Sequence, residues 1–343
     1  MKLPPDDGNT GPRGLRAAVK ITDVAAAAGV APMTVSRVIN TPDRVAAPTA
    51  LRVREAIALL GYVPNMIAGG LSSRRSRMIA AVVPTIAHPM FAEMVLNFGE
   101  AMREAGYQVM LTISGYGPEN EAEIIRTMLG RRPDALLLTG LERSPAVRRM
   151  LADSALPVVE IWDAGRSPTD MLVGFDHKEV GVAVARLFAR KGHTRFASIG
   201  AADPRAQVRI HGYRTEAECL AGTMLPAITT GAPSTILAGR EALRALLPKL
   251  DRPTALACSS DLLAFGALTE AQVQGIAVPE HLAICGFGNF ELGEACEPPI
   301  TTVNVEGATI GRIAARFVLE RLSGGTAARR TRVPFHIVER GTT

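Results

Sequence analysis

Apolar residues recur at helical spacing in two short runs near the start of the chain. The apolar positions are Ile21, Val24, Ala25, Ala28, Val35, Val38 and Ile39. Gly29 lies between the runs and can form a tight turn, and Pro32 suits the first turn of a helix. Thr22 and Asp23 stand where we expect the N-cap of the first helix. The pattern predicts a helix-turn-helix of the kind that enters a DNA major groove, although two helices of an ordinary bundle would share this periodicity.

Beyond residue 77 the pattern changes to short apolar strands that alternate with amphipathic helices. In a first series we expect strands at 78–84, 107–113, 135–139 and 158–161, and helices at 91–105 and 119–129. In a second series we expect strands at 196–200, 255–259 and 282–287, and helices at 180–190, 211–219 and 261–274. Alternating strands and helices favour parallel sheets, so two series predict two doubly wound α/β subdomains.

Three motifs near the N-terminus form one ordered signature. They are DVAAAAGV at 23–30, TVSRVIN at 34–40 and GYVPN at 61–65. Together they resemble the DNA-binding headpiece of the LacI/GalR family of bacterial repressors, and the resemblance continues to the end of the chain. It implies a small all-α helix-turn-helix headpiece and an α/β core similar to the periplasmic sugar-binding proteins. It also implies a homodimeric repressor that is controlled by a small effector and binds a near-palindromic operator in double-stranded DNA.

The resemblance also divides the chain into regions. We expect a disordered arm at 1–18, the headpiece at 19–64, a hinge at 65–77, and an effector-binding and dimerisation core at 78–343. Within the core we expect one subdomain at about 78–176 with 305–330, and the other at 177–304 with 331–343. The segments expected to cross back between them are 301–305, 309–322 and 333–338.

Charge is distributed unevenly between these regions. Residues 1–77 carry eleven Lys or Arg against five Asp or Glu, whereas the rest of the chain carries 27 against 28. The positive excess of the protein therefore lies in the first region, as expected of a module that contacts DNA phosphates.

The chain lacks the usual signs of export or of a metal site. The four cysteines (Cys219, Cys258, Cys285 and Cys296) lack metal-ligand spacing, and we interpret them as reduced and mostly buried thiols. The first fourteen residues contain no apolar segment of the kind found in signal peptides, and no apolar run is long enough to cross a bilayer. We therefore expect a cytoplasmic protein with no membrane partner, no metal and no other cofactor.

The family resemblance implies which residues contact DNA. Pro32, Met33 and Arg37 fall at the main base-reading positions, and arginine is the natural bidentate partner of guanine. Met33 could instead belong to the core of the headpiece. Phosphate contacts, which position a protein without reading the base sequence, are expected from Thr34, Ser36 and Asn40. The full expected set is Thr22, Pro32, Met33, Thr34, Ser36, Arg37, Asn40, Tyr62, Asn65, Ala68 and Leu71.

The hinge departs from the family pattern in one respect. Leu71 occupies the position of the minor-groove wedge that kinks the duplex, and Ala68 lies one helical turn before it. Gly69 and Gly70 fall inside the expected hinge helix, where each glycine costs roughly 1 kcal/mol relative to alanine. We expect a hinge that folds only on DNA, and the alternative is a plain flexible linker.

The resemblance and the strand pattern together indicate an effector cleft between the two subdomains. Ligands of open parallel sheets bind beyond the carboxyl ends of the strands, and two facing sheets bring those ends together. Arg209, in the segment RIHGY, matches the effector-binding arginine of the family, and Arg205 lies four residues earlier. Two guanidinium groups suit a carboxylate or a phosphate, although Arg205 could instead form an exposed ion pair.

Several positions differ from the family's sugar-binding pattern. Ser260-Asp261 replaces Asn-Asp, Gly286-Phe287-Gly288 replaces Gly-Tyr-Asp, and Ile236 stands at the usual ring-stacking aromatic position. Segments 84–95, 115–121, 157–163 and 173–177 instead come closest to the gluconate-operon repressors of the family. We therefore expect an open-chain sugar acid such as gluconate, or its phosphorylated derivative, as the effector.

In this interpretation the arginines bind the acid group, and Glu160, Asp163 and Asn289 bind hydroxyl groups. Trp162 could cap the site or belong to the core, and His88 could be a ligand group or a surface loop residue. The expected effector residues are His88, Phe91, Tyr116, Glu160, Asp163, Arg205, Arg209, Asp261 and Asn289.

Three alternatives to this function remain at the level of sequence. A neutral sugar or a nucleoside could replace the sugar acid. A solute-binding protein would share the core, but the headpiece and the lack of a signal peptide disfavour it. An enzyme acting on sugar acids would also share the fold class, but we find no nucleophile–base pair, no metal-ligand spacing and no glycine-rich phosphate loop.

Overall fold

The structure is a computed structural model of the whole chain. It describes residues 19–63, 75–117, 120–165, 168–220, 222–250, 254–326 and 328–343. The expectations for the arm, for most of the hinge and for Asn65, Ala68 and Leu71 lie outside these residues. The chain divides into two compact units, Met1–Ser76 and Arg77–Thr343, and each is described by itself.

The first unit contains the expected helix-turn-helix. Its elements are α1 (Ile21–Ala28), α2 (Pro32–Asn40), a 3-10 turn (Pro42–Arg44) and α3 (Ala47–Leu60). Val24, Val35 and Val53 are fully buried where the three helices meet, which explains the helical spacing of the apolar residues. Gly29 ends α1 with a φ of 63°, a left-handed conformation that glycine adopts without strain.

One detail of the headpiece prediction is wrong. The N-cap of α1 is Lys20, not Thr22 or Asp23. Asp23 stabilises the helix start from inside the first turn, because its carboxylate accepts the Lys20 N–H at 2.8 Å.

The second unit contains two six-stranded sheets, which define a first lobe and a second lobe. The first sheet has the order β11-β5-β4-β3-β1-β2, and all its pairs are parallel. Its strands are β1 (Met78–Val83), β2 (Gln108–Ile113), β3 (Ala135–Thr139), β4 (Val158–Ile161), β5 (Met171–Gly174) and β11 (Arg330–Arg332). The predicted fold class, a helical headpiece followed in the chain by two doubly wound parallel-sheet subdomains, is confirmed.

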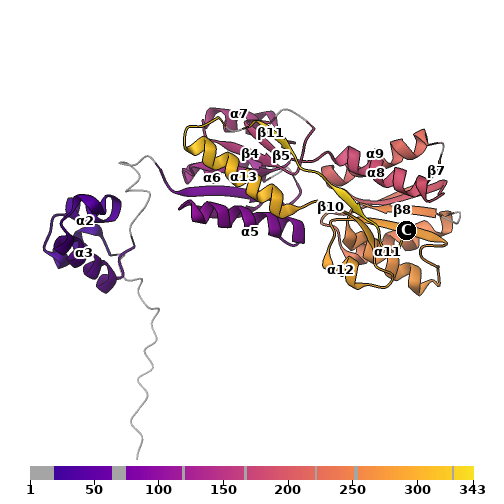
Figure 1. Ribbon diagram of the computed structural model, residues 1–343, viewed down its shortest axis with the longest axis horizontal. Coiled ribbons are helices and arrows are strands. Elements are labelled where there is room, and N and C mark those ends of the chain that lie inside the picture. The colour runs from indigo at the N-terminus through magenta and orange to yellow at the C-terminus, as the bar shows by residue number, and fades with distance from the viewer. Residues whose placement is uncertain are drawn as a thin grey trace, which may run out of the picture. The chain divides into compact units, whose positions relative to one another are not determined.

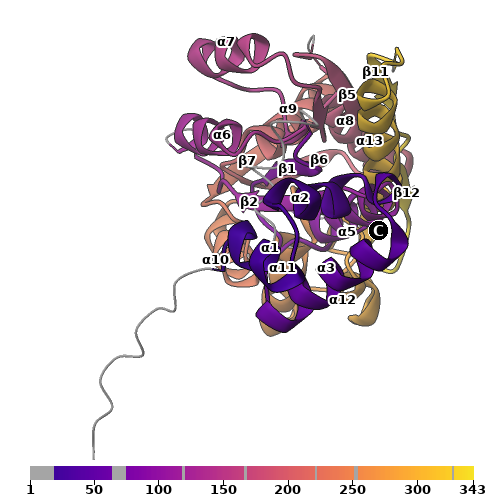
Figure 2. The same cartoon turned by 90° about the vertical axis from the view of Figure 1, so that its left-hand side faces the viewer.

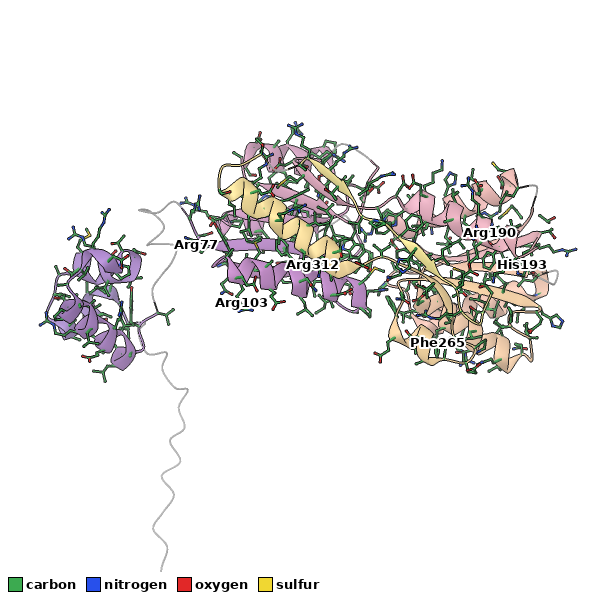
Figure 3. The ribbon with its side chains drawn as sticks, in the orientation of Figure 1. Arg77, Arg103, Arg190, His193, Phe265 and Arg312 are labelled. Carbon is green, nitrogen blue, oxygen red and sulfur yellow. The ribbon has the colours of Figure 1, made fainter. Side chains whose placement is uncertain are left out.

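Helices cover both faces of the first sheet. They are α5 (Pro89–Glu104), α6 (Glu121–Gly130), α7 (Pro145–Asp153) and α13 (Gly307–Leu322). Alternate residues of β1 point to opposite sides, so Ile79 packs with α5 and α13 while Ala80 packs with α6 and α7. Figure 2 shows these two helix pairs on opposite sides of the sheet. Arg103 on α5 and Arg312 on the adjacent α13 are labelled in Figure 3.

The second sheet repeats this plan with the order β12-β10-β9-β8-β6-β7. Its strands are β6 (Arg195–Ala201), β7 (Thr223–Thr230), β8 (Thr254–Cys258), β9 (Leu282–Phe287), β10 (Thr301–Asn304) and β12 (His336–Val338). Its helices are α8 (His177–Arg190), α9 (Pro204–Cys219), α10 (Ile236–Leu246), α11 (Asp261–Val273) and the short α12 (Glu291–Ala295), with a 3-10 turn at Leu247–Lys249. The β10–β12 pair is antiparallel, and the other pairs of this sheet are parallel.

The chain passes between the lobes at 174–177, 304–307 and 332–336, and its last part can be followed in yellow in Figure 1. Arg330–Arg332 pairs with β5 in the first sheet, so the expected assignment of 331–343 to the second lobe holds only from β12 onward. The segment 333–338 crosses between the lobes as expected, and strand β12 forms only at its end, His336–Val338.

The structure also contains elements that the sequence pattern does not predict, and two cysteines are less buried than expected. The additional elements are α7, α10, α12, β5, β7 and β11. Cys258 and Cys285 are buried as expected, whereas Cys219 is exposed and Cys296 is half-buried. No helix among the described residues is both long and apolar enough to span a membrane.

Candidate functional site

The exposed face of α2 carries the residues expected to read bases. Met33 is 63% exposed, which excludes the alternative that it belongs to the headpiece core. Pro32 and Arg37 are also exposed, while Val35 and Val38 point to the opposite side and are buried. The helix therefore separates a core face from a face that is free to contact a ligand.

The residues expected to bind phosphates lie on or near the same helix. Asn40 donates its side-chain N–H to the carbonyl oxygen of Ser36 at 3.0 Å and to its hydroxyl at 3.2 Å. Thr34 is half-buried, and Thr22 is exposed on α1. Tyr62 is half-buried and packs against the headpiece core.

The second unit contains two adjoining cavities at the strand ends of the two lobes. The outer compartment has a volume of about 390 Å³ and is lined by residues 84, 114–117, 121, 139–142, 163, 165, 176, 177, 204, 205 and 208. The inner compartment has a volume of about 40 Å³ and is lined by residues 88, 90, 91, 116, 162, 175, 177, 203, 205, 209, 234, 259, 260, 287 and 290. Tyr116, His177 and Arg205 line both, so the two compartments lie next to each other.

Arg209 is fixed at the inner compartment by three contacts. Its Nη2 donates to the carbonyl oxygen of Ser259 at 2.9 Å, and its Nη1 lies 2.9 Å from Nδ1 of His177. The guanidinium carbon lies 4.0 Å from the centre of the Phe287 ring, in a cation–π arrangement. Burial lowers the pKa of Arg209 to about 10, so the side chain is still a cation at neutral pH. Its Nε is buried and has no hydrogen-bond partner among the described residues.

His177 is not among the expected effector residues, and it holds Arg209 in place. Because a guanidinium can only donate, Nδ1 of His177 accepts from Arg209, and the proton of the neutral ring is on Nε2. That Nε2–H donates to the carbonyl oxygen of Trp162 at 2.9 Å. Burial lowers the pKa of His177 well below 6.5, and the charge of Arg209 lowers it further. His177 therefore connects α9 of the second lobe to the end of β4 in the first lobe.

Aromatic rings form the wall of the inner compartment. Trp162 is 1% exposed and lies 5.2 Å from Phe91 and 6.0 Å from Phe175, measured between ring centres. It is thus both a core residue and a lining residue, and its Nε1 has no hydrogen-bond partner within the described part of the chain. His88 is 8% exposed and lines the same compartment at the start of α5, so it is not a surface loop residue.

The helical position of Arg205 is as the sequence suggested. Arg205 and Arg209 lie one turn apart on α9, which begins at Pro204 with Asp203 as its N-cap. Arg205 lines both compartments, and its guanidinium carbon lies 5.8 Å from the centre of the Phe91 ring.

Tyr116 and Asp163 also lie at the cavity. Burial raises the pKa of Tyr116 to about 12, so its hydroxyl stays protonated and can donate a hydrogen bond. Asp163 lines the outer compartment, and one of its carboxylate oxygens accepts the N–H groups of Ala164 and Gly165 at 2.7 and 2.9 Å.

Three residues expected at the effector do not line either compartment. Glu160 is buried beneath the site, where it pairs with Arg143 at 2.7 Å and accepts the Thr169 N–H at 2.7 Å. Its carboxylate therefore has protein partners and is not a ligand group as predicted.

Asp261 and Asn289 are also directed to structural partners. Asp261 accepts the Thr302 hydroxyl at 2.6 Å and the Phe290 N–H at 2.7 Å. Asn289 accepts from Arg340 at 2.8 Å through its side-chain oxygen. Both residues follow strand ends, as ligand residues of this fold do, but their side chains connect α11, β10 and the chain end instead.

The described chain matches two known sequence families. Residues 20–65 match the family described as bacterial regulatory proteins, lacI family, and residues 185–343 match the periplasmic binding protein-like domain. These matches cover the helix-turn-helix and the part of the core that carries Arg205 and Arg209.

Similar proteins of known type span nearly the whole chain. The HTH-type transcriptional regulator GntR of Escherichia coli (strain K12) is 32% identical over 89% of this chain and 92% of that protein. GntR of Pseudomonas aeruginosa is 33% identical over 94% of each chain, and the HTH-type transcriptional repressor CytR of Escherichia coli is 30% identical over 90% of this chain and 91% of that protein. A crystal structure of a Lacl family regulator from Silicibacter pomeroyi has a TM-score of 0.88 with 32% identity, covering 94% of this chain and 99% of that one.

Proposed function

This chain belongs to the LacI family of bacterial regulatory proteins, and from that premise we propose that a sugar acid controls its binding to DNA. It is a DNA-binding transcriptional repressor and not an enzyme. The proposed effector is gluconate or a closely related acid, which binds in the inner and outer compartments.

The observation that carries this proposal is the buried guanidinium of Arg209. Arg205 adds a second cation one helical turn away, and both line the inner compartment. Two arginines at one cavity suit a carboxylate, which they can hold by charge-assisted hydrogen bonds. A neutral sugar would leave the buried charge of Arg209 without an anionic partner, apart from the nearby Asp203. The resemblance of segments 84–95 and 115–121 to gluconate-operon repressors supports the same class of ligand.

On the DNA side, we propose that Arg37 reads a guanine and that Pro32 and Met33 contact base edges or methyl groups. Thr22, Thr34, Ser36, Asn40 and Tyr62 would contact the phosphate backbone. The exposure of the α2 face supports this assignment.

We further propose that the repressor acts as a cytoplasmic homodimer in which each headpiece reads one half-site of the operator. β2 is the edge strand of the first sheet and exposes Ile113 to 53%, and Leu96 on the neighbouring α5 is 71% exposed. Exposed apolar side chains beside an open strand edge favour burial against a second copy. The effector would act through its different affinities for two arrangements of the lobes.

Replacement of the key cation tests the effector proposal. In calorimetry on the full chain we expect gluconate to bind and ribose and glucose not to bind. The Arg209→Ala variant should lose gluconate binding while keeping its affinity for the operator. Arg126→Ala, on the exposed face of α6, removes the same charge away from the cavity and should bind gluconate as the wild type does. Tight binding of ribose or glucose, with no binding of gluconate, would refute the proposal.

A further inference from the structure

The two compartments carry opposite charge. The inner compartment is lined by Arg209 and Arg205, with Asp203 as its acidic residue. The outer compartment is lined by Glu121, Glu142, Asp163 and Asp176, and Arg205 is the one cationic side chain among its described lining residues. A ligand that occupies both compartments therefore passes from a basic to an acidic environment.

Two of the four acidic residues of the outer compartment form ion pairs with arginines, and each of these arginines also pairs with a second carboxylate. Glu121 pairs with the buried Arg143 at 3.2 Å, and Asp176 pairs with Arg332 at 3.0 Å. For Asp163 and Glu142, by contrast, the described residues provide no ion pair. Among the described lining residues, the carboxylates that a ligand would meet without an arginine partner are therefore Asp163 and Glu142.

The sizes of the compartments decide where the two ends of a ligand can lie. At about 40 Å³ the inner compartment holds about three water-sized groups, since one such group needs roughly 10–15 Å³ of cavity volume. It can accept a carboxylate but not a six-carbon chain. The rest of such a ligand must lie in the outer compartment, whose volume of about 390 Å³ is within the range of ligand pockets.

We infer that Asp163 and Glu142 select against a second anionic group, so the preferred effector is a sugar acid with one anionic end and an uncharged, hydroxylated tail. This inference rests on the proposed function. It applies in either orientation, because a ligand with a carboxylate at one end and a phosphate at the other must place one of them in the outer compartment. Carboxylates suit hydroxyl groups, from which they accept hydrogen bonds, and they repel phosphate.

The test compares gluconate with 6-phosphogluconate, which differs by one terminal phosphate. In calorimetry on the full chain at low ionic strength, we expect gluconate to bind at least about tenfold more tightly. Higher salt should bring the affinities for gluconate and 6-phosphogluconate closer together, because screening weakens repulsion between the phosphate and the two carboxylates.

Charge removal then identifies the residues responsible. The double variant Glu142→Gln with Asp163→Asn should reduce the ratio of the gluconate affinity to the 6-phosphogluconate affinity severalfold, mainly because it binds 6-phosphogluconate more tightly. Its matched control is Glu104→Gln with Asp153→Asn, two exposed residues at the ends of α5 and α7, which should keep the wild-type ratio. Glu142→Gln alone, at an exposed position, should narrow the ratio partly even if the double variant folds poorly.

Each outcome has one meaning. Equal or tighter binding of 6-phosphogluconate by the wild type, or an unchanged ratio in the Glu142→Gln and double variants, would overturn the inference while leaving the sugar-acid effector intact. Binding of neither acid would overturn the proposed function itself, and the inference with it.

Discussion

Nη1 of Arg209 lies 2.9 Å from Nδ1 of His177, and this contact fixes both the position of the guanidinium and the tautomer of the imidazole. The two residues are 32 positions apart in the chain, on α9 and at the start of α8. Through Nε2 the same ring reaches the carbonyl oxygen of Trp162, which follows β4 in the other lobe. A ligand that binds Arg209 is therefore linked, through His177, to the contact with Trp162 between the lobes.

His177→Phe keeps the ring but removes both nitrogen contacts, so Arg209 loses one of its two hydrogen-bond partners. We expect gluconate affinity to fall roughly tenfold. A hydrogen bond to a charged group contributes about 1.5–3 kcal/mol, and a water molecule that binds Arg209 in place of the imidazole would recover part of this energy. Calorimetry measures this directly. His211→Phe, at an exposed position on α9, is the matched control and should bind normally. Unchanged affinity in His177→Phe would show that Arg209 holds its position without the imidazole.

Arg37→Ala should remove recognition of the operator and leave the effector site unaffected, because Arg37 and Arg209 belong to different compact units. We expect a loss of about 1–3 kcal/mol in discrimination between operator and scrambled DNA, as for a bidentate guanine contact. Competition gel-shift assays provide the measurement. Arg54→Ala on α3 also removes one headpiece charge, and it should weaken binding to both DNAs equally. Wild-type discrimination in Arg37→Ala would mean that α2 does not read the base at this position.

Asp261 should make stability depend on pH in the acid range. Burial raises its pKa from 3.8 to about 6, although its hydrogen bonds with Thr302 and Phe290 oppose that shift. Between about pH 4 and pH 6 the folded state therefore binds the proton more strongly than the unfolded state does. Its contribution to the free energy of unfolding is fully present below about pH 4 and is lost as the pH rises through 6.

Asp261→Asn cannot titrate, so the difference in unfolding free energy between wild type and variant should change with pH. Urea unfolding should show the wild type gaining about 2 kcal/mol relative to the variant between pH 7 and pH 4.5. Asp153→Asn, at the exposed end of α7, serves as the control for a surface carboxyl. A difference that stays constant with pH would contradict the raised pKa of Asp261.

Boundaries were predicted best where local signals mark them. α11 begins at Asp261 as expected, because Ser260 caps it through its hydroxyl, which accepts the Leu263 N–H. α9 begins at Pro204, seven residues before its expected start, because Asp203 caps it and its early residues follow no simple apolar period. β7 was missed for a similar reason, since it lies at a sheet edge and its burial pattern is irregular.

The ordered motifs at 23–30, 34–40 and 61–65 identify the family by resemblance and imply the fold class. The helical period, with Gly29 and Pro32, predicts the exposed face of α2, because these signals act within a few residues of each other. Arg205 and Arg209 line one cavity, which the family resemblance of Arg209 and the position of both residues after one strand predict. No local pattern predicts that Glu160 pairs with Arg143, that Asp261 accepts the Phe290 N–H, or that His177 positions Arg209. These pairs join residues 17 to 32 positions apart, and their contacts depend on which strands become neighbours and which carboxylates lose access to water.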